Sequence, residues 1–210
     1  MEKIDKFYEK IHGSYMAFIG LAIFLIGLII AIAVEPNFSF FVHHISHLGG
    51  PTNPAYIIFD VCWFITGIFI ILFLIFFTRY LQQKGGDIKG TWICFVLGFV
   101  SALGILGLAI FNYVDFPTLH LISELVFFFT GILYLIYYTI IELKIPEFSK
   151  AQAISNLIVA YFFVEYLVIL VANRIGPIFS PEVQSFTEWL FLFANLFWFF
   201  ENGLYTLKVK

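Results

Sequence analysis

Six long apolar stretches in a chain of 210 residues constrain its fold more than any other feature. A helix of about 20 residues, rising about 1.5 Å per residue, crosses a hydrocarbon core of about 30 Å. The pattern therefore predicts an all-α fold, an integral membrane bundle of six transmembrane helices. The predicted spans are residues 14–34, 56–78, 91–113, 119–142, 151–172 and 185–205.

The distribution of Lys and Arg along the chain predicts how these spans are oriented in the membrane. Ten of the eleven Lys and Arg residues lie before the first span, in alternate connections or after the last span, and Arg174 alone lies on the other side. Basic residues concentrate in the cytoplasmic loops of membrane proteins. The distribution predicts that both termini are cytoplasmic and that the loop of residues 35–55 is extracytoplasmic.

Composition leaves little room for anything beyond the membrane domain. The chain is 61% hydrophobic, and its longest connection, residues 35–55, is too short to enclose a core of its own. We therefore expect residues 1–210 to form a single six-span domain. The net charge of −3 and the scattered basic residues argue against a nucleic acid partner.

Polar residues inside the predicted spans indicate where a site lies. Asp60, Glu124, Glu165 and Glu188 come from four different spans, and each lies roughly 5–10 Å from the outer boundary at helical rise. Ionisable side chains in a membrane are costly and face the bundle interior. Glu188, Asn195 and Asn202 follow one face of the last span at intervals of seven residues, so this face should be buried. We expect a polar pocket in the outer leaflet, covered by the His-rich loop and lined by Asp60, His120, Glu124, Glu165, Glu188 and Arg174.

Histidine spacing suggests a metal at this pocket. His43 and His47 are four residues apart, as are His120 and Glu124, so each pair would share a face of a local helix. Imidazole and carboxylate groups are ligands for zinc or a similar divalent transition metal. The hypothetical ligand set is therefore His43, His47, His120 and Glu124. No pattern for another cofactor is present.

The same residues also allow interpretations that require no metal. Loop histidines are often only polar loop residues, and buried acids can form a structural network with Arg174. A proton or ion pathway is a further alternative, although the inner half offers only Asn195, Glu201 and Asn202 as polar groups.

The first loop carries a recurrent pattern. The run Ile-Ser-His-Leu-Gly-Gly-Pro at 45–51, followed by Asn53 and Pro54, resembles the first loop of the six-helix FGF-receptor-activating-protein and damage-regulated-autophagy-modulator superfamily, most closely its uncharacterised prokaryotic relatives. The layout of six spans and His120 at the start of the fourth also fit. His47 and Asp60 depart from the pattern, where an acid and an uncharged polar residue are expected. The resemblance implies a link to membrane lipids and the cytoplasmic membrane of a prokaryote.

Three classes of function follow. The leading hypothesis is a lipid-handling membrane protein. If it is an enzyme, we expect transfer or hydrolysis at a lipid headgroup or acyl linkage, with Glu124 or Glu188 as general base and His120 holding metal or exchanging protons. The alternatives are a non-catalytic subunit of a larger membrane complex, with membrane-protein partners or further copies of itself, and an ion or proton carrier.

Overall fold

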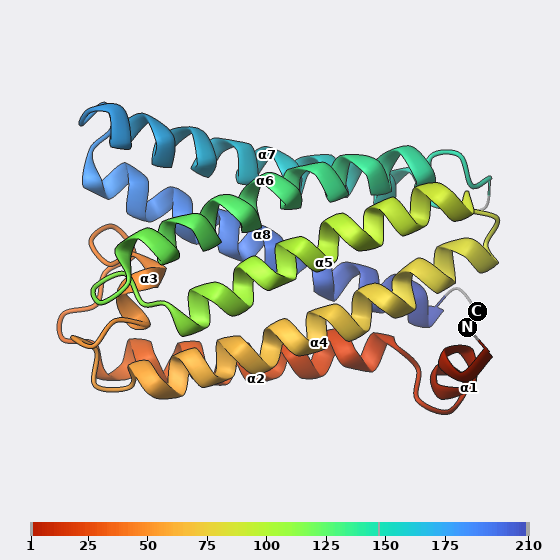
Figure 1. Ribbon diagram of the computed structural model, residues 1–210, viewed down its shortest axis with the longest axis horizontal. Coiled ribbons are helices and arrows are strands. Elements are labelled where there is room, and N and C mark those ends of the chain that lie inside the picture. Colours follow the sequence, from red (N-terminus) through yellow and green to blue (C-terminus); the bar gives the residue numbers. More distant parts are fainter. Residues whose placement is uncertain (1, 147, 209–210) are drawn as a thin grey trace.

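The structure, a computed structural model, describes residues 2–146 and 148–208, and this part of the chain contains helices and no strand. Six long helices run up and down along a common axis, and two short helices lie at the ends of the bundle (Figure 1). The helices are α1 (Glu2–Lys10), α2 (Ser14–Val34), α3 (Ile45–Leu48), α4 (Tyr56–Gln83), α5 (Ile88–Ile110), α6 (Pro117–Glu142), α7 (Lys150–Ile175) and α8 (Pro181–Lys208).

The six long helices form a closed ring. Each packs against the next one along the chain, and α8 closes the ring by packing against both α7 and α2. Small residues allow α2 and α4 to pack closely. The two helices are so close at Gly27 that a Cβ added there would lie 2.5 Å from the Cβ of Cys62. Such contacts supply the packing energy of helices in lipid, where no hydrophobic drive acts between them.

Helix ends differ from the predicted spans for local reasons. α2 coincides with the predicted 14–34, whereas α4 continues to Gln83 because polar residues can extend a helix beyond the hydrocarbon. α5 begins at Ile88 rather than at residue 91, since the Asp87 side chain accepts a hydrogen bond from the Gly90 amide at 2.6 Å and caps the helix. Pro117 opens α6, a position where its missing N–H is harmless.

Five of the helices, α2 and α4 to α7, are long and apolar enough to cross a membrane by length and composition. Among the described residues, α8 does not meet this test, because Glu188, Asn195, Glu201 and Asn202 interrupt its apolar sequence. α8 nevertheless runs the length of the bundle (Figure 1). The polar face of α8 is buried as predicted, with Glu188 and Asn195 each 6% exposed and Asn202 0% exposed.

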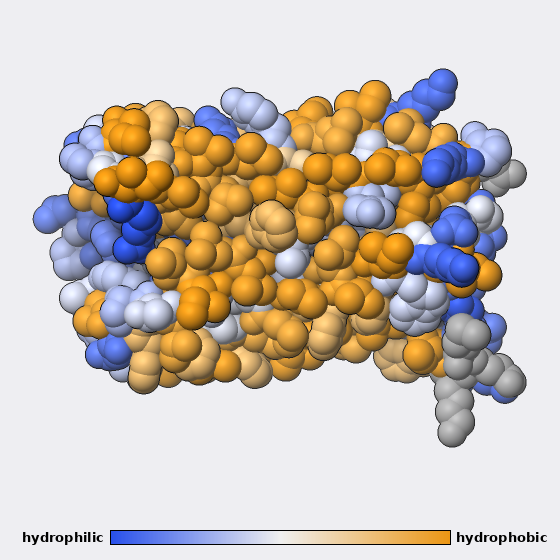
Figure 2. All heavy atoms as spheres, turned by 45° about the horizontal axis from the view of Figure 1, so that its top comes forward, coloured by the Kyte–Doolittle hydropathy of each residue, from blue (hydrophilic) through white to orange (hydrophobic). Residues whose placement is uncertain are grey.

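The surface agrees with a membrane protein. Figure 2 shows a broad hydrophobic band across the middle of the face in view, with hydrophilic residues gathered at its two ends. One end carries α1 and the last turn of α8, and the other carries α3 and the long first loop (Figure 1). Below, these are called the α1 end and the α3 end, and the loop of residues 35–55, which includes α3, is called the lid.

Candidate functional site

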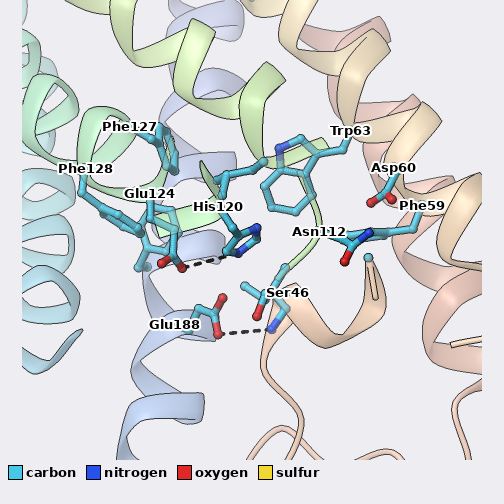
Figure 3. Close-up of a pocket in the computed structure, with 14 residues that line it drawn as sticks. Ser46, Phe59, Asp60, Trp63, Asn112, His120, Glu124, Phe127, Phe128 and Glu188 are labelled. Atoms are coloured by element: carbon cyan, nitrogen blue, oxygen red, sulfur yellow. Dashed lines mark hydrogen bonds and ion pairs between the residues drawn. The ribbon is translucent and has the colours of Figure 1, made fainter. Parts of the chain in front are cut away.

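A small cavity lies beneath the lid, between α3, α4, α5, α6 and α8. Aromatic side chains such as Trp63, Phe127 and Phe191 form its walls. Its volume is about 40 Å³, and a water molecule needs about 10–15 Å³ of such space, so the cavity has room for about three waters. Its polar lining residues are Ser46, Asp60, Asn112, His120, Glu124 and Glu188 (Figure 3).

Glu188 fastens the lid to α8. Its Oε2 lies 2.8 Å from Nδ1 of His44 and accepts a hydrogen bond from the Ile45 amide at 3.2 Å. Two neighbours on α8 add to this attachment: Trp189 donates from Nε1 to the His43 carbonyl at 2.8 Å, and Ser185 donates to the Phe40 carbonyl at 3.1 Å. Three residues of α8 therefore hold the lid closed over the cavity.

His120 and Glu124 form the second polar element, one turn apart on α6. His120 Nδ1 is 2.6 Å from the Phe111 carbonyl oxygen, which can only accept, so this nitrogen carries the proton. His120 Nε2 then faces the Glu124 carboxylate at 3.9 Å (Figure 3). Glu124 is 7% exposed and accepts no hydrogen bond from the described residues, so its carboxyl group is free to bind a ligand.

Asp60 approaches the cavity from α4, on the side opposite Glu124 and Glu188 (Figure 3). The lid passes very close to it, since a Cβ at Gly49 would lie 2.5 Å from Asp60 Oδ1. A larger residue at Gly49 would require the Asp60 carboxyl group or the lid to move. The predicted pocket residues Asp60, Glu124, Glu188 and His120 thus line one cavity.

Two predicted pocket residues do not line it. Glu165 is half-buried on α7 and Arg174 is exposed near the end of that helix, and neither borders the cavity. No residue of α7 is among those that line the cavity. Arg174 nevertheless interacts electrostatically with Glu124 and His120, so the structural network of acids with Arg174 stays a prediction.

The four hypothetical metal ligands are not brought together. α3 begins at Ile45, so the backbone at His43 is not helical and His43 and His47 do not share a helix face. His43 lies 3.6 Å from Glu35 and stacks on Phe38, whereas the His47 ring lies 5.1 Å from the Tyr113 ring. Within residues 2–146 and 148–208, no group of three His, Cys, Asp or Glu side chains is arranged to hold a metal ion.

Some site residues were not expected from the sequence. His44 was part of the His-rich segment, but its pairing with Glu188 has no signal in the sequence. Trp63 and Asn112 border the cavity and were also not singled out. Asn112 lies two residues after the end of α5, and a polar residue near the end of a predicted span, at the depth of the acidic layer, is a usable signal.

Acid should loosen the lid. Burial lowers the pKa of His47, and the neighbouring His44 and His43 lower this pKa further. Glu188 and Glu35 act in the opposite direction. An open lid takes up a proton near the ordinary pKa of about 6.5, before the closed lid does, so closure weakens as the pH falls below that value. We expect amide hydrogen exchange in the lid, corrected for intrinsic rates, to rise on acidification. The rise should be smaller in His47→Gln, and an identical pH dependence in both proteins would contradict the assignment to His47.

Comparison with known proteins identifies a family for most of the chain. A family model described as "Protein of unknown function (DUF998)" matches residues 18–200, which include the lid, the whole of α4 to α7 and most of α2 and α8. No curated protein and no solved structure matches the chain. The site is therefore interpreted from its own geometry.

Proposed function

The chain belongs to the DUF998 family of proteins of unknown function, and from its geometry we propose that it is a six-span membrane protein that binds the polar end of a lipid beneath its lid. The proposal places both termini on the cytoplasmic side of a prokaryotic cytoplasmic membrane. Basic residues at the α1 end support this orientation, since cytoplasmic loops carry an excess of Lys and Arg. α8 is the sixth span, with its polar face toward the bundle interior rather than lipid.

The observation that carries the proposal is the charge of the cavity lining. Its titratable groups are three carboxyl groups, Asp60, Glu124 and Glu188, and one imidazole, and no Lys or Arg is among the residues that line it. Although His44 binds Glu188 and Arg174 acts on Glu124 from outside the lining, a lining rich in carboxyl groups disfavours an isolated phosphate and favours a positively charged or hydrogen-donating group. Aromatic walls suit the apolar remainder of the same ligand, and cation–π contact with Trp63 would add to the binding of an ammonium group.

The preferred ligand class is therefore an amphiphile with an amine at its polar end. A cavity of about 40 Å³ is too small for such a group, so the lid has to open before the ligand enters. The link to lipids draws also on the resemblance of the first loop to the FGF-receptor-activating-protein and damage-regulated-autophagy-modulator superfamily, which is separate from the family match.

If binding is followed by chemistry, Glu124 is the residue placed to act as general base. Its carboxyl group lies in the cavity, accepts no hydrogen bond from the described residues and faces His120 Nε2 at 3.9 Å. Glu188 is a weaker candidate for that role, because its Oε2 already binds His44 and the Ile45 amide. Proton exchange between Glu124 and His120 would serve hydrolysis or transfer at a headgroup.

Lipid binding by the purified protein tests the proposal. In native mass spectrometry from detergent, we expect phosphatidylethanolamine, which carries an amine, to bind at least fivefold more tightly than phosphatidylglycerol, which lacks one. Glu124→Gln should remove this preference, because the amide keeps the shape but not the charge. Glu182→Gln is the matched control, since Glu182 is an exposed acid on α8. Equal binding of the two lipids by the wild-type protein would contradict an amine-selective pocket.

A further inference from the structure

A second buried acid lies far from the cavity, at the α1 end of the bundle. Glu142 is the last residue of α6 and is 1% exposed. Its Oε2 accepts a hydrogen bond from Asn156 Nδ2 at 2.7 Å, and among the described residues its Oε1 is buried without any partner. Burying a carboxyl group this deeply costs free energy, whether the group is charged or protonated, unless its oxygens are hydrogen-bonded.

Neighbouring side chains hold this site in place without neutralising it. Asn156 is positioned by Trp198, whose Nε1 donates to Asn156 Oδ1, and Gln152 donates to Asn202 at 3.1 Å in the same region. No Lys, Arg or His of the described part pairs with Glu142. The titratable groups that interact with it electrostatically are Glu201 on α8, Cys94 on α5 and Tyr138 on α6.

The contrast with Glu188 is informative. Glu188 makes two contacts to the lid from one oxygen, at 2.8 and 3.2 Å. Glu142 receives one hydrogen bond, from the neutral amide of Asn156, and its Oε1 has no hydrogen-bond partner among the described residues. This oxygen is therefore available to accept a proton. An acid in this condition is suited to gain and lose a proton.

Buried polar atoms without a hydrogen-bond partner occur at several positions in the bundle interior. The described residues contain five side chains with a buried polar atom that lacks a partner, each worth roughly 1–3 kcal/mol of lost solvation. All five lie on the helices that surround the interior: Trp63, Asn195, Tyr138, Glu142 and Glu201. Such atoms mark places where water is expected.

The outer part of this route is a pair of adjoining cavities. A second cavity of about 30 Å³, with room for about two waters, is lined by Asn195 and Thr66. It shares Trp63, Phe127 and Phe191 with the cavity beneath the lid. Water in both would extend from Glu124 and Glu188 to Asn195, midway along α8.

An aromatic barrier separates Asn195 from Glu142. Trp198 packs against Phe73, Phe77, Tyr134 and Tyr138, with ring centroids 5.6–6.4 Å apart. The Tyr138 hydroxyl, which lies beside Thr78, is a polar group within this barrier. Any transfer across it therefore depends on motion of these rings, which makes the route gated and slow rather than an open channel.

We propose that this protein transfers protons across the membrane, with Glu142 as the proton-binding site near the α1 end and the acidic cavity beneath the lid as the opposite end of the route. Glu142 takes a proton from the interior route as an O–H bond forms on its free oxygen, and releases it as H⁺ to water at the α1 end, where Glu201 is half-exposed. The transfer involves no oxidation or reduction, and the proton gradient across the membrane drives it. The route shares Glu124 and Glu188 with the proposed lipid site, but proton transfer does not require a bound lipid.

Proton flux into vesicles is the decisive experiment. The full chain is reconstituted in liposomes that contain a pH-sensitive dye, and a potassium gradient with valinomycin drives protons inward. We expect acidification above that of protein-free vesicles, a loss of at least tenfold in Glu142→Gln, and an unchanged rate in Glu182→Gln. Flux equal to protein-free vesicles, or unchanged in Glu142→Gln, overturns the proposal.

Infrared spectroscopy keeps the proposal testable if Glu142→Gln assembles poorly. A protonated buried carboxyl group has a C=O stretching band distinct from that of a carboxylate. In the wild-type protein in detergent, the band assigned to Glu142 by its shift in Glu142→Asp or its loss in Glu142→Gln should change reversibly with pH. A band that stays constant while the protein remains folded identifies a fixed structural acid and also overturns the proposal.

Discussion

We expect Trp198→Ala to lower the free energy of unfolding of the bundle more than the truncation of any other single buried aromatic residue. Trp198 is 0% exposed and lies where α4, α6 and α8 meet, in contact with four rings of α4 and α6. Truncating a buried Trp to Ala costs about 3–5 kcal/mol in a packed interior. The change also removes the hydrogen bond to Asn156, which positions Glu142.

Thermal unfolding in detergent, followed by far-ultraviolet circular dichroism, measures this effect. The matched control is Trp92→Ala, because Trp92 is 38% exposed near the start of α5 and should change the free energy of unfolding by less than about 0.5 kcal/mol. Equal losses in the two variants would mean that the aromatic cluster does not hold the three helices together.

The helices and the depth of polar residues could be predicted from the sequence, because both depend on position along the chain. Hydropathy over about 20 residues locates a span, and counting residues from its end gives the depth of a side chain. Asp60, Glu124, Glu188 and His120 were placed in one layer in this way, and they line one cavity.

The rotation of a helix about its own axis is harder to predict from the sequence than the depth of its residues. Glu165 has the correct depth but not the correct direction: Phe163 and Tyr166, on either side of it, are 0% and 2% exposed, which leaves Glu165 half-buried on another face of α7. An α7 rich in apolar residues all round gives too weak a pattern to fix this rotation from sequence alone.

Loop conformation and helix ends account for the remaining differences. The metal hypothesis assumed that residues 43–47 are helical, yet α3 begins only at Ile45, and four-residue spacing places two side chains on one face only within a helix. Glu142 was taken as the boundary of a span. Its burial depends on α7 packing against the end of α6, which the sequence pattern does not reveal.

Glu188→Ala is expected to release the lid. The substitution leaves His44 and the Ile45 amide without their shared acceptor, and leaving a buried hydrogen-bonding group unpaired costs roughly 1–3 kcal/mol. The lid is attached elsewhere as well, since Asn53 donates to the Ala31 carbonyl of α2 at 3.0 Å. We therefore expect local opening of the lid rather than unfolding of the bundle.

Hydrogen exchange resolves this difference along the chain. A loss of about 3 kcal/mol in the free energy of opening corresponds to a rise of roughly a hundredfold in the exchange of lid amides, with amides in the middle of α4 and α6 unchanged. Glu182→Ala, an exposed acid on the same helix, should alter neither region. Uniform loss of protection in Glu188→Ala would mean that Glu188 supports the bundle as a whole. Unchanged protection of the lid would mean that Trp189 and Ser185 suffice to close it, and that opening for a ligand must break those two contacts instead.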